Sequence, residues 1–517
     1  MYQNTGIKSF YDDKVIFITG GSGFVGKVLI EKLLRSCPGV KKIYILLREK
    51  KERSAEERMK GLFNIELFKI LRSRYPNFEE KVQAIAGDLM LDRLGISDED
   101  RSLLQKSVDI VIHSAATVRF DEQLRTAVQM NVIAVREMVK LCRSMEKLKM
   151  FCHVSTAYSN CDKSAIAEKL YPVSTDPQKL IDSLDWMSDE IVDAMTPNLL
   201  GNYPNTYTFT KGLAEHIVTN EGGDMPIVIV RPSIIIGSYA EPFPGWIDNY
   251  NGPSGLIVAA GKGMLRTMKY SSDAVADVVP VDFVANAIIT AVWYSTNNRG
   301  PEPLIYNCTS GNVNPLTWKY LGIYGQLTLK KYPFEEIFRR PNFSFESNRL
   351  AYFYWRYVSH RIPAVIADTM SILIGSKPRV WRFYDRMEKA VKTLEFFTIK
   401  GWSWTGDNFL ALSDAIPEEE KKIFNFDMTT IQWDEYIEIF VLGIKQYLMK
   451  DRLENLAKAR WQVTRYRLVR WISCTLFFIV TCRVLFIRSL KFRQLWFRVV
   501  FAAYRALRSL NLVSVAR

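Results

Sequence analysis

Short apolar runs alternate with amphipathic stretches along the first half of the chain. Each run has four to six residues, which is short for a buried helix and typical of a strand that is covered on both faces. The stretches between them, such as Gly26–Arg35 and Ala127–Met145, repeat apolar residues with helical spacing. The runs that we predict as strands are Lys14–Thr19, Lys42–Leu47, Val82–Ala86, Asp109–Ile112, Met150–Val154 and Ile227–Val230.

This alternation predicts an α/β fold, a Rossmann-type doubly wound parallel sheet with helices on both faces. The pattern changes around Arg339–Arg349, and the sequence beyond is rich in aromatic residues and reads as helical, with a helix start at Pro417–Lys422. The three parts that we expect are a doubly wound domain at 1–345, a mostly helical C-terminal domain at 346–450 and a basic, hydrophobic tail at 451–517.

The tail combines apolar runs with nearly all of the net charge. The chain carries +14, and residues 452–517 hold 14 Lys or Arg against one acid. Trp471–Ile487 contains only Arg483 as a charge and is at the short limit of a spanning helix, whereas Leu495–Val513 gathers arginines on one face, as interfacial helices do. We predict a membrane anchor, either a short span plus an interfacial helix or a monotopic hairpin. The alternative is a soluble basic helix pair that packs on a partner protein.

Composition narrows the class of protein. With 48% apolar and 24% charged residues, the chain is not disordered. Seven cysteines without a CxxC pair and four histidines without an i, i+4 pair predict neither a disulfide scaffold nor a metal site. The body is nearly neutral, so we expect no nucleic-acid partner. The first fourteen residues lack the apolar run of a secretory signal, so we expect the body in a reducing compartment; the sequence predicts no oligomeric state.

A glycine-rich loop follows the first predicted strand and is typical of dinucleotide binding. Its spacing is GxxGxxG, and glycines there permit a tight turn, close approach to a pyrophosphate and close helix–strand packing. The helix that follows offers free N–H groups to phosphate. The alternative is an ordinary glycine turn. The loop residues that we predict to bind a cofactor are Thr19, Gly20, Ser22, Gly23, Phe24, Val25 and Gly26.

Basic residues after the second strand favour NADP over NAD. Arg48 stands 22 residues beyond the glycine loop, where an NAD site usually has an acid, and Lys50 adds a second cation, although Glu49 lies between them. The alternative is a solvated charge run. After the third strand, a carboxylate is suited to bind the adenine amino group, and small residues after the fourth let the cofactor approach closely. These further positions are Asp88, Leu89, Ala115 and Ala116.

Tyr207 and Lys211 form a YxxxK pair that suits proton transfer. On a helix the two share a face, and a nearby ammonium is expected to lower the pKa of the phenol. The phenol can then protonate a carbonyl oxygen as a hydride arrives. Ser155 and Thr156, at the end of the fifth strand, offer a hydroxyl for the same carbonyl. A hydroxyl, a tyrosine and a lysine on a dinucleotide fold predict a reductase.

Longer strings make the resemblance to a family specific. The glycine loop, the Thr156/Tyr207/Lys211 set and Arg231-Pro232-Ser233 resemble the extended short-chain dehydrogenases/reductases. Five further strings are similar to alcohol-forming fatty acyl-CoA reductases, and the similarity runs from about residue 10 to the C-terminus. They are His113–Glu122, His153–Asn160, Glu241–Asp248, Asn251–Gly255 and Tyr306–Pro315.

This resemblance implies a reaction and roles for the site residues. A long-chain acyl-CoA would accept hydride from NADPH and lose CoA to give an aldehyde, and a second NADPH would reduce the aldehyde to a primary alcohol for wax or ether lipids. Tyr207 would be the general acid, Lys211 its pKa-lowering and ribose-binding partner, and Thr156 the carbonyl donor, with Ser155 as the second candidate. The resemblance also places Pro232 and Ser233 at the nicotinamide.

The resemblance also implies a cell location and a use for the C-terminal aromatics. We expect an intracellular membrane with the reductase facing the cytosol, the peroxisomal membrane favoured and the endoplasmic reticulum as the alternative. Aromatics between residues 350 and 445 could form a groove for the acyl chain, although most are expected in the helical core. They are Tyr352, Phe353, Trp355, Tyr384, Phe396, Phe397, Trp402 and Trp404.

Two other functions share part of this pattern. A membrane-bound sterol dehydrogenase or a sugar-nucleotide epimerase would share the glycine loop and the YxxxK pair, but not the large helical C-terminal region. A non-enzymatic NADPH-sensing membrane protein would need the loop and no proton donor, so Tyr207 and Lys211 argue against it.

Overall fold

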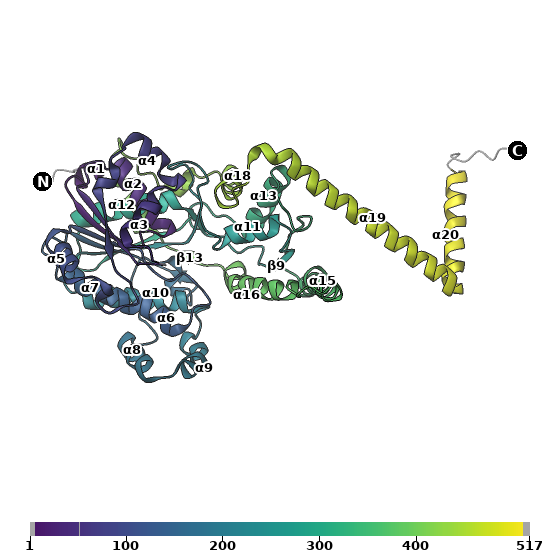
Figure 1. Cartoon of the computed structure of the whole chain (residues 1–517), viewed down its shortest axis with the longest axis horizontal. Coiled ribbons are helices and arrows are strands. Elements are labelled where there is room, and N and C mark those ends of the chain that lie inside the picture. Colours follow the sequence, from purple (N-terminus) through teal and green to yellow (C-terminus); the bar gives the residue numbers. More distant parts are fainter. Residues whose placement is uncertain (1–5, 51, 510–517) are drawn as a thin grey trace.

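A computed structural model describes residues 6–50 and 52–509 of the chain. A body built around one sheet occupies one end of the molecule, and a long helical tail projects from the other (Figure 1).

The main sheet has seven parallel strands in the order β11-β7-β5-β4-β1-β2-β3. The chain starts in the middle with β1, proceeds to β3 at one edge, and then returns to β4 on the other side of β1. This reversal makes the crevice beyond the carboxyl ends of β1 and β4 the place where such sheets bind ligands. The strands are β1 (Val15–Thr19), β2 (Lys42–Leu47), β3 (Val82–Ala86), β4 (Ile110–His113), β5 (Met150–Val154), β7 (Ile227–Pro232) and β11 (Leu304–Cys308).

The doubly wound parallel fold predicted from the sequence is confirmed, and all six predicted strands form. Their side chains alternate between two cores: Ile16 and Ile18 of β1 pack in one, and Phe17 packs in the other. Helices α2 (Phe24–Ser36) and α12 (Val281–Asn297) contribute to the first core, and α7 (Ala134–Arg143) and α10 (Thr206–Gly222) to the second. Burial on both faces explains why the strands read as continuous apolar runs.

Shorter elements surround the sheet. The predicted helix Ala127–Met145 forms as α6 (Leu124–Val128), a π-helical turn (Gln129–Ile133) and α7 in succession. The other helices of the first half are α1 (Ile7–Phe10), α3 (Ala55–Phe63), α4 (Lys69–Arg74), α5 (Asp98–Ser107), α8 (Pro177–Trp186), α9 (Asp189–Leu200) and α11 (Pro253–Gly261). The small strands are β6 (Ala165–Ile166), β8 (Ile234–Ile236), β9 (Thr267–Lys269), β10 (Val278–Pro280), β12 (Ser344–Glu346) and β13 (Ser403–Trp404).

The C-terminal region is mostly helical, as predicted, and it folds back onto the sheet domain. Strand β12, at the predicted boundary, pairs with β9, and strand β13, within the mostly helical region, pairs with β6. The domain boundaries at 345 and 450 stay a prediction. The helices here are α13 (Trp318–Lys331), α14 (Arg349–Arg356), a π-helical turn (Tyr357–Arg361), α15 (Ile362–Leu373), α16 (Val380–Ile399), α17 (Asp407–Asp414) and α18 (Trp433–Gly443).

The helix start predicted at Pro417–Lys422 is wrong, because this segment forms turns. The carboxylate of Glu420 accepts the N–H groups of Ile7 and Lys8, at 2.6 and 3.1 Å. Its acidic character therefore serves the first turn of α1, a tertiary contact that the local sequence pattern does not reveal.

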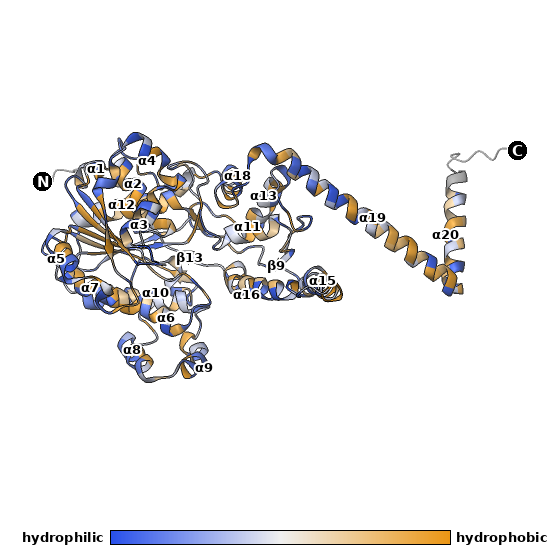
Figure 2. Cartoon of the chain, in the orientation of Figure 1, coloured by the Kyte–Doolittle hydropathy of each residue, from blue (hydrophilic) through white to orange (hydrophobic). Residues whose placement is uncertain are grey.

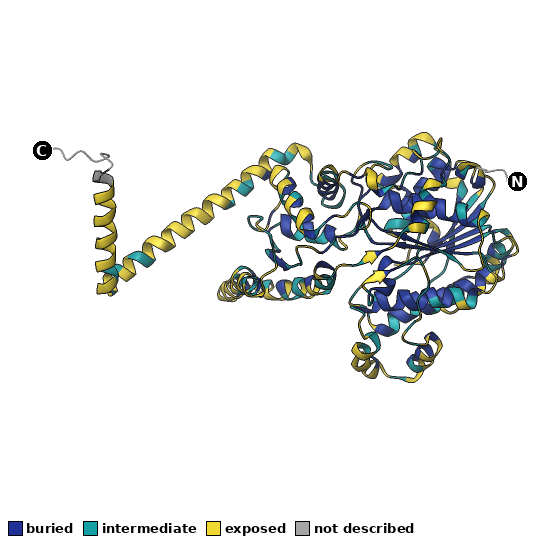
Figure 3. Cartoon of the chain, turned by 180° about the vertical axis from the view of Figure 1, so that it is seen from behind, coloured by how far each residue is buried: buried dark blue, intermediate teal, exposed yellow. Residues whose placement is uncertain are grey.

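Two helices form the tail, α19 (Leu456–Arg488) and α20 (Leu490–Ser509). The stretch Leu453–Arg488 is long and apolar enough to cross a membrane, and its most apolar window has no buried residue (Figures 2 and 3). This is consistent with membrane anchoring. The predicted span Trp471–Ile487 lies within α19. The predicted interfacial segment Leu495–Val513 follows α20 up to residue 509, and its last four residues lie outside the described part of the chain.

Candidate active site

The glycine loop between β1 and α2 has the geometry of a phosphate cradle. Gly20 has a φ of +75°, and a Cβ there would lie 2.8 Å from the backbone nitrogen of Ala115. A Cβ on Gly26 would overlap the carbonyl oxygen of Gly20. Ser22 and Gly23 are exposed, and no side chain caps the first turn of α2. The loop therefore leaves helix N–H groups available to an anion.

Three predicted loop residues direct their side chains into the protein. Thr19 is fully buried and shares a hydrogen bond with Nδ1 of His113, at 2.8 Å. Phe24 stacks on Trp246 with centroids 5.4 Å apart, and Val25 packs against the core. Only their backbone can serve a ligand in the crevice, and the side chains fix the loop on β4 and on the Trp246 segment.

The predicted adenosine-side residues meet at the ends of β2 and β3. Nη1 of Arg48 lies 3.6 Å from Oδ2 of Asp88, whose Oδ1 accepts the N–H of Met90 at 3.0 Å. Asp88 is thus already partnered, whereas Arg48 remains half-exposed. Lys50 is exposed, and Leu89 packs partly against the second core. The two cations remain accessible to a ligand phosphate.

Thr156, Tyr207 and Lys211 come together at the carboxyl end of β5. Asn205 caps α10 by accepting the N–H of Thr208 at 2.9 Å, which sets Tyr207 in the first turn. The side chain of Thr156 is hydrogen-bonded to that of Tyr207. Nζ of Lys211 donates to the carbonyl oxygen of Val154, at 2.7 Å. The YxxxK pair and the strand hydroxyl therefore meet at the carboxyl edge of the sheet.

Burial decides the protonation of this pair. It raises the pKa of Tyr207 to about 12, although the hydrogen bond from Thr156 opposes the shift. It lowers the pKa of Lys211 to about 8, against the pull of Glu215. The expected lowering of the Tyr207 pKa is therefore wrong for this structure, because burial disfavours the phenolate and outweighs the effect of Thr156. A phenol with a high pKa keeps its proton at neutral pH and can donate it.

Ser155 serves a buried ion pair instead of the crevice. Its hydroxyl donates to Oε1 of Glu215, which also accepts from Nε of Arg231 at 2.9 Å. The other oxygen of Glu215 accepts from Nη2 of Arg231, at 2.7 Å. Between the two adjacent hydroxyls, the geometry favours Thr156 as the one that faces a substrate. Sequence reasoning missed Glu215, although it follows Lys211 by one helical turn on the same face.

The remaining predicted residues frame the crevice. The carbonyl oxygen of Pro232 accepts a hydrogen bond from the Thr156 hydroxyl at 3.4 Å. The backbone N–H of Ser233 donates to the carbonyl oxygen of Cys308 at 3.1 Å. Ala115 N–H donates to the Thr19 hydroxyl, at 3.3 Å. Ala116 directly precedes Thr117, whose backbone N–H is hydrogen-bonded to the side chain of Asn131.

Asn131, in the π-helical turn, joins the Thr117 segment to α10. Its Oδ1 accepts the N–H of Thr117 at 2.9 Å, and its Nδ2 donates to the Thr210 hydroxyl at 3.0 Å. No spacing in the sequence marked this residue.

An aromatic wall from the C-terminal region closes the crevice beside Tyr207. Phe120 stacks on Tyr207 at 5.9 Å and packs on Phe397 at 5.4 Å. The indole of Trp404 donates to the carbonyl oxygen of Ala157 at 3.1 Å, close to Thr156. Two of the sequence-derived aromatics, Phe397 and Trp404, thus line the site, and they come from a segment about 200 residues beyond Tyr207.

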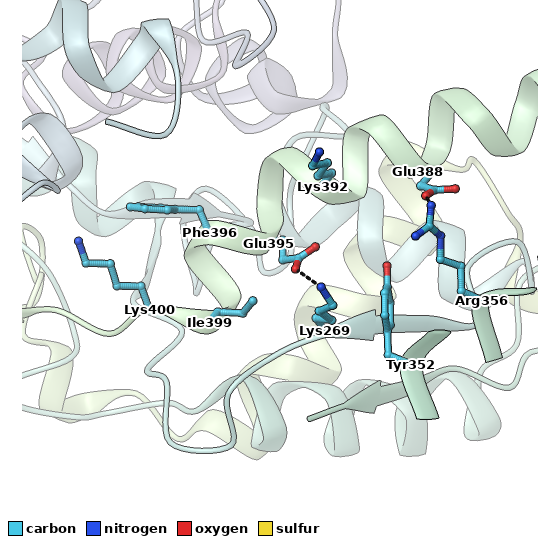
Figure 4. A pocket seen from close by; sticks show the side chains of 9 residues that line it. All are labelled: Lys269, Tyr352, Arg356, Glu388, Lys392, Glu395, Phe396, Ile399 and Lys400. Carbon is cyan, nitrogen blue, oxygen red and sulfur yellow. Dashed lines mark hydrogen bonds and ion pairs between the residues drawn. The ribbon is translucent and has the colours of Figure 1, made fainter. Parts of the chain in front are cut away.

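A cavity of about 520 Å³ opens behind this wall, between α14, α16 and β9 (Figure 4). Its two carboxylates are paired, Glu395 with Lys269 at 2.8 Å and Glu388 with Arg356. Among the described residues, Lys392 and Lys400 have no carboxylate partner there. The cavity is lined by Lys269, Tyr352, Arg356, Glu388, Lys392, Glu395, Phe396, Ile399 and Lys400.

Curated relatives match nearly the whole chain, and two family models match most of it. Two models described as male sterility protein match residues 18–288, as its NAD-binding part, and 359–451. Fatty acyl-CoA reductase 1 of Xenopus laevis is 46% identical over 501 residues, covering 97% of both chains. The human enzyme of the same name is 45% identical, and fatty acyl-CoA reductase 2 of Bos taurus is 43% identical, with the same coverage.

Solved structures share the fold at low identity. The reductase domain of a nonribosomal peptide synthetase from Mycobacterium tuberculosis matches with a TM-score of 0.56 and 17% identity, covering 84% of this chain and 91% of that one. The terminal reductase domain of the myxalamid pathway matches with a TM-score of 0.54 and 17% identity, covering 85% and 93%. At this identity the likeness supports the fold alone.

Proposed function

As this chain belongs to the fatty acyl-CoA reductase family, we propose that it reduces long-chain fatty acyl-CoA to a primary fatty alcohol and CoA, with NADPH as the reductant and the aldehyde as an intermediate. The observation that carries the proposal is the group of Thr156, Tyr207 and Lys211 at the carboxyl end of β5, beside the glycine loop. The alcohol would supply wax or ether lipid synthesis.

The nucleotide crevice fits a nicotinamide dinucleotide. The positions where a Cβ would fill the cradle are glycines, and the uncapped start of α2 suits a pyrophosphate. Arg48 and Lys50 suit the 2′-phosphate of NADP, which supports NADPH over NADH. Bound there, NADPH would supply one hydride to the thioester carbonyl and, from a second molecule, one to the aldehyde.

The residues of the chain supply protons and position the carbonyl. Tyr207 donates its phenolic proton to the carbonyl oxygen, and the hydroxyl of Thr156 donates a second hydrogen bond to the same oxygen. The first hydride and the proton from Tyr207 would convert the thioester to a hemithioacetal. Its C–S bond then breaks, the hydroxyl proton passes to sulfur, and CoA leaves as the thiol while the aldehyde forms. Lys211, with a pKa of about 8, lies one turn from Tyr207 and holds a charge that stabilises the phenolate.

We assign the CoA phosphates to the cavity beside α16. Lys392 and Lys400 bring positive charge without a carboxylate partner among the described residues, and phosphates attract such groups. Ring contacts connect the cavity to the catalytic tyrosine: Phe396 to Phe397 at 5.4 Å, and from there through Phe120. The pantetheine arm would follow this wall to place the thioester at Tyr207.

The tail is the basis for the proposed location of the protein in the cell. The apolar helix α19 supports anchoring in an intracellular membrane, with the reductase domain facing the cytosol where acyl-CoA and NADPH are available. The peroxisomal membrane is favoured and the endoplasmic reticulum is the alternative. Microscopy of the tagged chain with markers of both organelles separates them.

The reaction is tested by its stoichiometry. Detergent-purified protein with palmitoyl-CoA should oxidise two NADPH per CoA released and yield fatty alcohol, identified by mass spectrometry. One NADPH per CoA with free aldehyde would contradict the second step, and turnover of a sterol or a sugar nucleotide without acyl-CoA turnover would contradict the substrate.

The cofactor preference is tested by Arg48→Asp, which replaces a cation suited to the 2′-phosphate by a carboxylate. This variant should shift the preference from NADPH towards NADH.

The mechanism is tested by Tyr207→Phe, which should bind NADPH and turn over no acyl-CoA. The matched control is Tyr203→Phe, a nearby tyrosine whose ring packs on Phe209. Unchanged turnover in the Tyr207 variant contradicts the assigned acid.

A further inference from the structure

Helix α15 presents an apolar face to solvent. Ile362, Ile366, Met370 and Leu373 recur every three or four residues and are 51–79% exposed. The opposite face is turned into the protein and holds Ala364 and Asp368, both buried. A surface helix of a soluble domain has the reverse arrangement.

The neighbouring helix α14, the π-helical turn after it and the ends of α15 and α16 expose further apolar residues. Figure 3 draws much of this part of the chain as exposed. Trp and Tyr are prominent in it, and these residues are enriched at membrane–water interfaces. Monomeric soluble proteins rarely expose apolar patches of this extent. The α15 patch comprises Leu350, Tyr354, Trp355, Tyr357, Val358, Ile362, Val365, Ile366, Met370, Ile372, Leu373, Ile374, Trp381 and Phe383.

Polar contacts on the inner side fix this orientation. The carboxylate of Asp368 accepts the backbone N–H groups of residues 379, 380 and 381, at 2.8–2.9 Å, which ties α15 to the start of α16. Arg361, at the start of α15, pairs with Glu388 of α16. The apolar face therefore points outward because the inner face is specifically bonded.

The surroundings of the patch are basic. Residues 349–392 hold nine Lys or Arg and three acids. All three acids are already engaged: Asp368 by backbone N–H groups, Asp385 by Arg361 and Lys389, and Glu388 by Arg356 and Arg361. An apolar face with a basic rim is complementary to an anionic lipid surface.

An arginine cluster connects the patch to the base of the tail. We define it as Arg266, Arg339, Arg340, Arg467 and Arg470. The N–H of Arg266 donates to Nε2 of His360, in the turn before α15, at 3.0 Å. Burial, followed by the charges of Arg339 and Arg470, lowers the pKa of Arg266 to about 10. Arg470 immediately precedes the apolar part of α19, and α15 and α19 project from the same end of the body (Figure 1).

We propose that the α15 patch is a second membrane-contact surface, which lies in the headgroup region of the bilayer that α19 enters and seats the arginine cluster on anionic lipid. The tail then sets the distance of the body from the membrane, and the patch sets its orientation. Given the function proposed above, the cavity beside α16 lies between the bilayer and Tyr207, so that an acyl-CoA resting in the leaflet reaches the site without crossing water.

The full-length chain in vesicles of phosphatidylcholine and phosphatidylserine tests this without an activity assay. Replacing Cys474 and Cys482 by alanine leaves five cysteines, all buried, so that one spin label can be placed at will. With Leu373→Cys, the label should collide more with oxygen than with a water-soluble nickel chelate. With Met195→Cys, an exposed apolar position on α9, the preference should be reversed.

A second variant separates docking from anchoring. Ile366→Glu with Met370→Glu should return the label at 373 to water, while α19 keeps the protein resistant to carbonate extraction and NADPH binding shows that the body is folded. A label at 373 that is in water in the parent chain overturns the proposal. Strong spin–spin broadening at 373 also overturns it, because the patch would then join two copies of the chain.

Discussion

Two adjacent hydroxyls at the end of β5 have different partners, and this predicts different defects. Thr156→Ala removes the donor that faces the carbonyl and should lower kcat by about 10²–10³-fold, the usual loss for one oxyanion donor. Ser155→Ala should change kcat little and lower the free energy of unfolding by about 1–3 kcal/mol, because Glu215 loses a buried partner. Steady-state kinetics and thermal melts of both variants check this.

The opposite result would be equally clear. If Ser155→Ala lost activity at an unchanged Tm while Thr156→Ala remained active, Ser155 would be the carbonyl donor.

The depressed pKa of Lys211 predicts a basic limb in the pH profile. Lys211 is charged below a pH of about 8 and neutral above it, so kcat should fall as the pH rises through that value. Tyr207 keeps its proton up to a pH of about 12 and adds no limb in this range. In Lys211→Arg the charge persists, and the limb should disappear. A kcat of the parent chain that stays constant between about pH 7 and 9 in the same assay would contradict this role.

Sequence reasoning identified the three residues that meet in the crevice but not their protonation. The YxxxK spacing predicts that Tyr207 and Lys211 lie on the same face of a helix, because this depends only on the helical period. It does not give the burial that raises the pKa of Tyr207, nor the engagement of Ser155 by Glu215, because both depend on segments far away in the chain.

The turn into α2 predicts a sharp contrast between two glycines. Gly26→Ala would place a Cβ on the carbonyl of Gly20 and should abolish NADPH binding or destabilise the fold. Gly61→Ala, in the middle of α3, meets no atom within 4 Å and should stabilise the protein by about 0.5–1 kcal/mol. Calorimetry and NADPH titration compare the two. Normal NADPH affinity in Gly26→Ala would contradict the cradle.

The cavity beside α16 predicts a specific KM effect. Lys392→Glu should raise the KM for acyl-CoA by about two- to fivefold, the effect of one exposed charge pair, and leave the KM for NADPH unchanged. Lys179→Glu on α8 is the matched control and should change neither. Equal effects of the two variants would place the CoA phosphates elsewhere.

Strands with a distinctive local sequence pattern could be predicted, whereas strands formed through contacts with distant segments could not. Six strands of the main sheet were recognisable because they are apolar on both faces. Strand β11 was missed: Leu304–Cys308 includes Asn307, whose side chain bonds the β6 and β13 segments. The two-residue strand β13 exists only through its pairing with β6, 238 positions earlier in sequence, so local pattern carries no trace of it.

Contacts at the base of α19 decide where the tail can be removed. Ala459 is buried, and Val463 and Tyr466 pack against the main core. A chain ending at Arg470 should therefore keep the Tm of the body, whereas one ending at residue 452 should lose stability. The 1–470 chain lacks the apolar part of α19, so carbonate should release it from vesicles. Through the α15 patch it should still bind them until salt screens the basic rim of the patch. Flotation assays at low and high salt check this. Carbonate-resistant binding of the 1–470 chain would contradict anchoring by α19.

The pairing of β13 with β6 also has a consequence for the nascent chain. Every strand of the main sheet and every predicted cofactor residue is synthesised by residue 308, but the tryptophan that closes the wall over Ala157 follows almost a hundred residues later. A ribosome-bound chain can thus complete its dinucleotide half while Tyr158 still lacks its aromatic cover. We expect the nucleotide to be the first ligand that the growing protein can hold, and the acyl thioester to be excluded until the wall has been translated.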